Sequence, residues 1–356
     1  MKFAIWSLSN PLPGLSYGDL YRSQLGEIGL AEELGFDHYW LYEHHVSPHS
    51  AMPSPNLMIA AAARETRRIR LGAMVNILPY RHPLMVAEEM AMLDVLTDGR
   101  IDCGIGRGLK PLEFRAFGVD QDKSREIFLE SIEAILKIWR DENFTHSGKY
   151  FNFEKASPLT PPLVQKPHPP LYISAQSQDS LRWAAEHDVP FGQIDALIDE
   201  CKRDQAFYRD IQVKSGHAPR PRLFLTREIY VAETDKQAMA EAKPYLIQHW
   251  DLWARYTQFS EAGEMPDSYD HWRKHAPKLY AMKFEEIVER GLIIAGSPET
   301  VTRHIRAHAR ELDLAILLGV FRFGGMPYDM AARSLTAFSK YVMPHCRDVE
   351  RALQQA

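Results

Sequence analysis

The sequence of 356 residues predicts an α/β protein in which eight parallel strands, each followed by a helix, close into a (β/α)8 TIM barrel. Short apolar runs rich in β-branched and aromatic residues alternate with longer segments of helical period, which is typical of repeated βα units. Eight such runs occur, and eight strands suffice to close a barrel. Length alone would allow one or two domains, and we expect a single barrel domain with insertions spanning residues 1–356.

The expected strands are spaced so that a helix fits in most of the intervals. They cover residues 2–8, 37–42, 70–77, 100–105, 171–175, 189–193, 223–231 and 314–318. Right-handed crossovers and short connections make a closed barrel the simplest topology for them, with a doubly wound open sheet as the alternative.

Three helices are indicated by their boundaries or their period. Residues 17–34 end at Gly35, and residues 83–96 begin with Pro83 and stop before the Asp98-Gly99 pair. Residues 124–140 repeat apolar side chains at helical spacing. We expect these helices in the outer ring of the barrel.

Two stretches do not fit a minimal βα repeat and are predicted insertions. Residues 143–170 are rich in proline after an expected hairpin, and residues 245–282 are rich in Trp, Tyr and His. The second composition suits either a mobile lid over an active site at the carboxyl ends of the strands or a surface excursion.

Composition excludes several classes of protein. Hydrophobic residues make up 45% and charged residues 25%, which is ordinary for a globular enzyme. The net charge of −5 comes from 42 basic and 47 acidic residues spread along the chain, so we expect no nucleic-acid partner. The three cysteines lack CxxC spacing, which favours a reducing cytoplasm over a disulfide framework. No export signal and no apolar run long enough to cross a membrane is visible.

The first candidate for chemistry is Tyr42-Glu43-His44-His45, at the carboxyl end of the second expected strand, where barrel enzymes display catalytic side chains. Histidine titrates near pH ~6.5, and a neighbouring carboxylate can fix its tautomer. Adjacent residues point in opposite directions, so we expect only one of the two histidines to face a pocket. A surface or interface histidine is the structural alternative.

The second candidate, Gly104 to Leu109, carries glycines and one arginine directly after a strand. Its backbone N–H groups could approach a phosphate while Arg107 adds a charged clamp. Leu109 stands where a dinucleotide fingerprint would require its third glycine, so that interpretation is weak. A tight turn with a solvated arginine is the alternative.

The third candidate, Ser174 to Ser180, leads into an expected helix and offers hydroxyls at its N-terminus, a natural anion site. Ordinary N-capping by Ser177 or Asp179 is the alternative. Together with Arg107, this loop could hold one phosphate.

Metal binding is disfavoured despite fifteen histidines, since neither HExxH nor HxH occurs. We therefore expect no metal, and a metal-dependent hydrolase of the same fold is a minor alternative. No GxSxG motif, P-loop or catalytic-cysteine setting is present either.

At these residues the sequence resembles the bacterial luciferase-like flavin-dependent monooxygenases, and the luciferase alpha-subunit-like subgroup in particular. The matching motifs run in order along nearly the whole chain, and the combination of EHH, HP, GR and GRG in register is specific. They are Gly35-Phe36-Asp37, Trp40 to His45, Leu71-Gly72, Leu78-Pro79, His82-Pro83, Leu93-Asp94, Gly99-Arg100, Gly106-Arg107-Gly108, Phe117-Gly118, His249-Trp250, Trp272-Arg273 and Val342-Met343-Pro344.

The resemblance implies a barrel that binds reduced FMN, reacts it with O2 to a C4a-(hydro)peroxyflavin and transfers one oxygen atom to a substrate. His44 matches the catalytic histidine of the family. The positions that match cofactor-binding residues are Arg107, Leu109, Gln176, Ser177 and Ser180 for the phosphate, Met74 and Val75 for the isoalloxazine ring, often through a non-prolyl cis peptide, and Trp250 near the ring.

The resemblance also implies a substrate side lined by Trp6, Ile105, Gly106, Phe191 and Gln193. These residues are mainly apolar, so we expect a hydrophobic aldehyde, ketone, terpene or alkane-like substrate. The sequence departs from the family where Gln176 replaces an acidic residue and Lys110 replaces an aromatic one. We therefore expect the contacts of the phosphate site to differ from those of the family.

A separate flavin reductase is expected to supply FMNH2, because no nicotinamide fingerprint is visible. The family also implies a homodimer, or a heterodimer with a related subunit, through helices beside the second and third strands, with His45 and Glu88 as candidate interface residues. Two other functions stay open on this fold: a deazaflavin (F420)-dependent dehydrogenase, and a non-catalytic flavin-binding relative.

Overall fold

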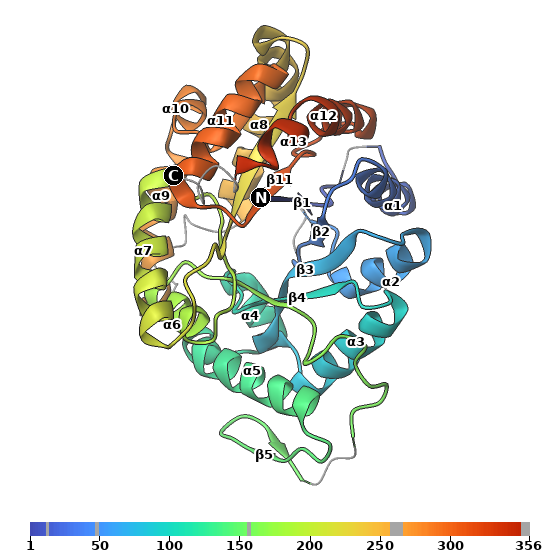
Figure 1. Cartoon of the computed structure of the whole chain (residues 1–356), viewed down its shortest axis with the longest axis vertical. Coiled ribbons are helices and arrows are strands. Elements are labelled where there is room, and N and C mark those ends of the chain that lie inside the picture. The colour runs from blue at the N-terminus through green and yellow to red at the C-terminus, as the bar shows by residue number, and fades with distance from the viewer. Residues whose placement is uncertain (12–13, 47–49, 155–157, 257–265, 350–356) are drawn as a thin grey trace.

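Eight parallel strands close into a barrel in the computed structural model, which describes residues 1–11, 14–46, 50–154, 158–256 and 266–349 (Figure 1). Each strand pairs with its neighbour in chain order, and pairings of β8 with β9 and of β11 with β1 complete the ring. All eight expected strands are confirmed. They are β1 (Lys2–Ser7), β2 (His38–Leu41), β3 (Arg70–Ile77), β4 (Ile101–Gly106), β7 (Leu171–Ser174), β8 (Phe191–Gln193), β9 (Leu223–Val231) and β11 (Ile316–Val320).

A further parallel strand, β10 (Ile293–Gly296), lies outside the ring and was not predicted. It pairs with the last four residues of β9, from Glu228 to Val231. The pairing is available because β9 has nine residues, and β11 and β8 take up only its first part. β10 thus extends the sheet beyond the closed barrel.

Helices surround the strands, as the (β/α)8 prediction requires (Figure 1). The three helices expected from the sequence are confirmed as α1 (Tyr17–Glu33), α3 (Pro83–Leu96) and α5 (Ser124–Arg140). The remaining described helices are α2 (Pro55–Glu65), α4 (Pro111–Phe117), α6 (Gln178–Glu186), α7 (Ile198–Lys214), α8 (Asp235–Tyr256), α9 (Asp270–Tyr280), α10 (Phe284–Glu289), α11 (Pro298–Leu312), α12 (Tyr328–Tyr341) and α13 (Met343–Cys346), with short 3-10 turns at Leu78–Tyr80, Gln121–Lys123 and Asp267–Tyr269.

The stretch predicted as the first insertion contains a small hairpin of β5 (His146–Ser147) and β6 (Asn152–Phe153). The Glu130 carboxylate on α5 accepts hydrogen bonds from the backbone N–H groups of residues 149–151, which fastens the hairpin to the barrel. Asp94 on α3 likewise accepts from the N–H groups of Val164 and Gln165. Backbone–carboxylate bonds therefore hold this stretch against the helical ring.

The stretch predicted as the second insertion, residues 245–282, begins inside a helix, because α8 continues unbroken to Tyr256. Residues 257–265 lie outside the described part of the chain. The stretch then continues through the 3-10 turn Asp267–Tyr269 and helix α9.

The amino-terminal end of the barrel interior is filled by a buried ion network. Asp102 on β4 accepts through Oδ1 from Arg70 Nε at 2.7 Å and through Oδ2 from Trp40 Nε1 at 3.0 Å, and His38 Nδ1 lies 2.6 Å from the same Oδ2. Burial alone would raise the pKa of Asp102, but His38 and Arg70 hold it below its ordinary value. With this end filled, a ligand cavity is left to the carboxyl ends of the strands.

Close approach of β3 and β4 leaves no room for a side chain at Gly104, where a Cβ would overlap the carbonyl oxygen of Ala73. We expect Gly104→Ala to lower the free energy of unfolding by about 1–3 kcal/mol, because the strands must separate to admit the methyl group. Urea denaturation followed by circular dichroism measures this. Gly29→Ala is the matched control, since nothing lies within 4 Å of its Cβ position and an alanine in helix α1 should stabilise slightly. Equal stability of the two variants would contradict the interpretation.

Candidate active site

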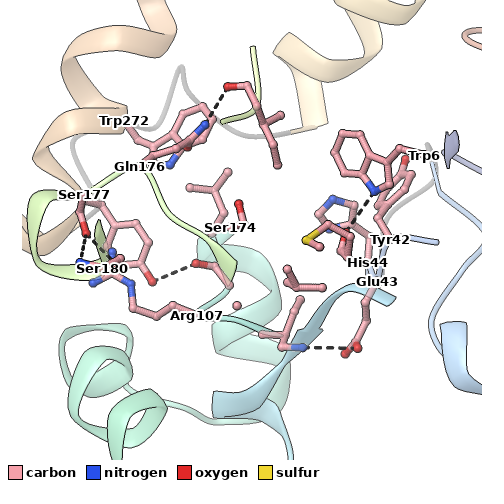
Figure 2. A pocket seen from close by; sticks show the side chains of 18 of the residues that line it. Trp6, Tyr42, Glu43, His44, Arg107, Ser174, Gln176, Ser177, Ser180 and Trp272 are labelled. Atoms are coloured by element: carbon pink, nitrogen blue, oxygen red, sulfur yellow. Dashed lines mark hydrogen bonds between the residues drawn. The ribbon is translucent and has the colours of Figure 1, made fainter. Parts of the chain in front are cut away.

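A cavity of about 930 Å³, including its mouth, opens at the carboxyl ends of strands β1 to β4 and β7 (Figure 2). Its lining contains ten of the residues predicted for the site: Trp6, His44, Met74, Val75, Gly106, Arg107, Leu109, Gln176, Ser177 and Ser180.

His44 lines the cavity just beyond β2 and is held from behind by a buried carboxylate. Its Nδ1 lies 2.9 Å from Oε1 of Glu113 on helix α4, and the same oxygen accepts the backbone N–H of His45 at 3.0 Å. Glu113 is fully buried. The imidazole ring also contacts the rings of Tyr42 and Trp253 edge-on.

Electrostatics fix the protonation of this pair. Burial, followed by the nearby Lys110 ammonium, lowers the pKa of His44 to about 4. Burial works to raise the pKa of Glu113, but His44 and Lys110 outweigh it and the pKa is lowered. A neutral imidazole beside an ionised carboxylate must donate from Nδ1, so Nε2 is the acceptor nitrogen. His44 is thereby prepared to accept a proton or a hydrogen bond at neutral pH.

His45 points away from the cavity, as the alternation of neighbouring residues predicts. Its Nε2 lies 2.8 Å from Oε1 of Glu43, and its ring packs edge-on against Phe117 of helix α4. Glu43 itself lines the cavity and also accepts, at the longer distance of 3.4 Å, from the backbone N–H of Ile77. The adjacent histidines therefore have different surroundings.

The opposite side of the cavity has the features of an anion site. Figure 2 shows Arg107, Ser177 and Ser180 grouped together, away from Trp6 and His44. Ser177 caps helix α6 by accepting from the N–H of Ser180, so the helix N-terminus faces this group. Burial lowers the pKa of Arg107, but arginine remains a cation at neutral pH.

Tyr269 completes the anion site from a distant part of the chain. The Arg107 guanidinium lies over the Tyr269 ring, 3.9 Å from its centroid, and the Tyr269 hydroxyl donates to the carbonyl of Gly108 at 3.0 Å. Gln176, where the family resemblance shows an acidic residue, donates from Nε2 to the carbonyl of Ile194 at 2.7 Å. Its amide therefore ties the loops after β7 and β8 together.

The wall between His44 and the anion site is apolar and closely packed. The Met74–Val75 peptide bond is cis, as the resemblance implies, and Trp6 Nε1 donates to the Met74 carbonyl at 3.1 Å. A Cβ at Gly106 would overlap the Val75 side chain. Glycine is thus required where β4 passes this wall.

Four residues predicted for the site do not line the cavity. Ile105 packs among the side chains between the strands and the helices, Phe191 stacks on Tyr208 of α7, and Gln193 donates to Asp204 of α7 at 3.1 Å. All three point outward because strand residues alternate between the two faces, which leaves the inward positions to Gly106 and Ile194. Trp250 is buried in a cluster of apolar side chains. Trp253, about one turn later on α8, lines the cavity instead.

Several residues that build the site were not predicted from the sequence. Trp253, Tyr269 and Trp272 line the cavity, and Glu113 holds His44. Helical spacing from Trp250 could have indicated Trp253. Nothing in the sequence pattern indicates that α4 returns Glu113 to the end of β2.

A second polar cluster lies behind Trp253, whose Nε1 donates to Oδ2 of Asp195 at 3.1 Å. Asp195, Glu228 and His249 are all buried, and His249 Nε2 lies 3.5 Å from Glu228 Oε1. Burial and then the Glu228 charge raise the pKa of Asp195 to about 6. The cluster supports the indole that faces His44.

Comparison with known proteins identifies the family. Residues 1–314 match the model of the luciferase-like monooxygenases. The chain belongs to this family. Among the described residues, no helix is long and apolar enough to cross a membrane.

Three relatives illustrate the family. The structure of monooxygenase RslO1 from Streptomyces bottropensis is 26% identical, with a TM-score of 0.82 over 97% of this chain and 99% of that one. The oxygenating constituent of 3,6-diketocamphane monooxygenase from Pseudomonas putida, a type II Baeyer–Villiger monooxygenase solved with FMN, is 25% identical, with a TM-score of 0.79 over 97% and 98%. The oxygenase component of the flavin-dependent trigonelline monooxygenase from Acinetobacter baylyi is 29% identical over 63% of this chain and 62% of that protein. These relatives support an oxidoreductase activity for this chain.

The raised pKa of Asp195 predicts a dependence of stability on pH. Between its ordinary value of 3.8 and about 6, the folded state keeps a proton that the unfolded chain releases, so raising the pH through this window destabilises the fold. We expect Asp195→Asn to melt at a higher temperature than the wild type above pH 6, with the difference lost below pH 3.8. Differential scanning calorimetry across this range measures the effect. The exposed Asp141→Asn control should show no such crossover, and a wild-type-like profile for Asp195→Asn would contradict the prediction.

Proposed function

We propose that this chain is the oxygenase component of a two-component flavin-dependent monooxygenase. In this proposal it uses reduced FMN and O2 to add one oxygen atom to a small, mainly apolar organic substrate such as an aldehyde, ketone, terpene or alkane-like molecule. The observation that carries the proposal is one cavity that holds a buried anion site at one end and a neutral, oriented histidine at the other.

The residues present fit the phosphate of FMN. Arg107 supplies a half-buried cation, and the Ser177 and Ser180 hydroxyls lie beside it at the N-terminus of the nine-residue helix α6. Arginine and helix N-termini both favour phosphate oxygens. In our proposal the phosphate binds here, between the loops that follow β4 and β7.

The apolar wall fits a flat, largely apolar ring. Met74, Val75 and Leu109 line the cavity between the anion site and His44. Reduced flavin bound there supplies the chemistry that activates O2. His44 is proposed to accept a proton or a hydrogen bond at Nε2 beside the reacting centre, with its Nδ1 held by Glu113.

Exclusion of water is the other task of this chain. Trp253, Tyr269 and Trp272 all come from residues 245–282 and form aromatic walls of the cavity. We propose that this stretch acts as the lid, because a dry cavity favours oxygen transfer to substrate over loss of hydrogen peroxide. A separate reductase is proposed to supply FMNH2, in line with the relative named as an oxygenase component.

The proposed phosphate site predicts a selective loss of affinity in Arg107→Gln. Removing one charge-assisted interaction of about 1.5–3 kcal/mol should weaken FMN binding by roughly 10- to 150-fold. Riboflavin lacks the phosphate, so its affinity should be unchanged. Equilibrium dialysis with both flavins measures the difference, and an equal effect on both would contradict a phosphate contact at Arg107.

The proposed role of His44 predicts a loss of oxygen transfer without a loss of cofactor. We expect His44→Ala to bind FMN normally but to form about 10²-fold less oxygenated product per FMNH2 consumed, with more hydrogen peroxide released. Single-turnover assays with a panel of apolar ketones and aldehydes measure both products. His187→Ala, an exposed histidine on the C-terminal cap of α6, is the control. If the wild type turns over substrate without O2 and needs a deazaflavin to do so, the result would favour the dehydrogenase instead.

We also propose a dimer, homodimeric or with a related subunit, through helices α2 and α3. Their outer faces expose Leu57, Met85 and Met92, at 75%, 57% and 55% of their surface, an arrangement that a protein partner would cover. The Leu57→Asp, Met92→Asp double variant should therefore sediment as a monomer at micromolar concentration where the wild type is a dimer. Val213→Asp, which changes an equally exposed side chain on α7, should leave the dimer intact. A monomeric wild type would contradict the homodimer.

A further inference from the structure

Lys110 is a buried lysine next to the candidate catalytic histidine. It is the N-cap residue of helix α4 and is only 1% exposed. Its Nζ lies 3.9 Å from Oε1 of Glu113 and 5.5 Å from the centroid of the Trp253 ring. Lysine is rarely buried to this degree, because removing an ammonium group from water is costly unless a compensating partner is present.

One oxygen atom connects Lys110 to His44. Oε1 of Glu113 lies 3.9 Å from the Lys110 ammonium, and it is also the atom that accepts from Nδ1 of His44 at 2.9 Å. The backbone N–H of His45 donates to the same oxygen at 3.0 Å, which fixes the position of the carboxylate. A change in charge at Lys110 is therefore transmitted to His44 through the Glu113 carboxylate.

In the described part of the chain, the other ionisable side chains packed around this group do not replace Lys110. His45 is paired with Glu43 at 2.8 Å on the far side of the β2 loop. The hydroxyl groups of Tyr80 and Tyr269 carry no charge at neutral pH, since burial raises the pKa of each. Among these neighbours, Lys110 is the one that brings a full positive charge towards Glu113.

We propose that Lys110 is a positioning residue for His44: its ammonium keeps Glu113 ionised, and Glu113 in turn holds His44 in the tautomer that carries its proton on Nδ1. The unprotonated Nε2 is then the acceptor of a ring that lines the cavity. Lys110 does not line the cavity itself, and it acts on His44 through Glu113 and through the field of its own charge. The inference deepens the proposed function and rests on it only in taking His44 as the acid–base group.

The proposal has a consequence for the pH response of His44. Burial, only partly offset by Glu113, lowers the pKa of Lys110 to about 7, so the ammonium loses its proton as the pH passes through neutrality. The Lys110 charge lowers the pKa of His44, so a variant without that charge should bind a proton at His44 at a higher pH than about 4. His44 should therefore sense two titrations, its own and that of Lys110.

Nitrogen-15 NMR of the FMN-free protein, labelled at histidine, tests this directly. The His44 signals are assigned by their loss in His44→Gln. In the wild type we expect a protonated Nδ1 and an unprotonated Nε2 at neutral pH, and the nitrogen chemical shifts of His44 should change in a step near pH 7, where Lys110 loses its proton.

In Lys110→Met the step should vanish and the protonation of His44 should move to higher pH. In Lys110→Arg, which stays charged, the step should vanish while His44 still protonates near pH 4. Lys123→Met, at an exposed lysine paired with Asp120, is the matched control and should behave as the wild type.

Two results would overturn the proposal. One is a folded Lys110→Met protein, judged by circular dichroism, whose His44 tautomer and titration equal those of the wild type. If that variant does not fold, Lys110→Arg decides, and retention of the step near pH 7 in that variant is the second result that would refute it. Because the protein carries no flavin in this experiment, the result does not depend on whether the chain transfers oxygen.

Discussion

The parallel pairing of β1 with β11 is the constraint on which the site depends, because it joins the two ends of an otherwise open sheet. Closure fixes which end of the interior can hold a ligand. The buried network around Asp102 fills the amino-terminal end, so the loops after β2, β4 and β7 converge on one cavity at the other end. His44 and Arg107 follow two strands, β2 and β4, that only β3 separates in the sheet, and they lie at opposite ends of this cavity.

Within the cavity, charge is arranged so that one group stays neutral. The Glu113 carboxylate contacts His44 and lies near the Lys110 ammonium, and the burial of His44 outweighs the attraction of this carboxylate for a second proton. At the other end Arg107 keeps its charge and is stacked on an aromatic ring. The site thus separates a cationic region suited to binding from a neutral region suited to proton transfer, with apolar residues between them.

The fold could be predicted from the sequence because short apolar runs mark its strands and segments of helical period mark its helices, and the two alternate along the chain. β10 was not predicted, because its four residues, Ile293–Gly296, are too few to show a pattern. They pair only with the last four residues of β9. The site was predictable where residues sit on loops, as with His44 and Arg107. It was mispredicted within strand β8, where a difference of one residue, between Gln193 and Ile194, decides whether a side chain faces the helices or the cavity. Glu113 could not be predicted, since its role depends on the path of α4 in three dimensions.

The stacking of Arg107 on Tyr269 has a consequence for how the protein is made. The Tyr269 hydroxyl bonds to Gly108, a residue 161 positions earlier in the chain. During synthesis the loop that carries Arg107 leaves the ribosome long before the tyrosine that covers it, at a rate of roughly 5–20 residues per second. The anion site is therefore incomplete on the nascent chain until the last third of the sequence, which contains Tyr269, has been translated.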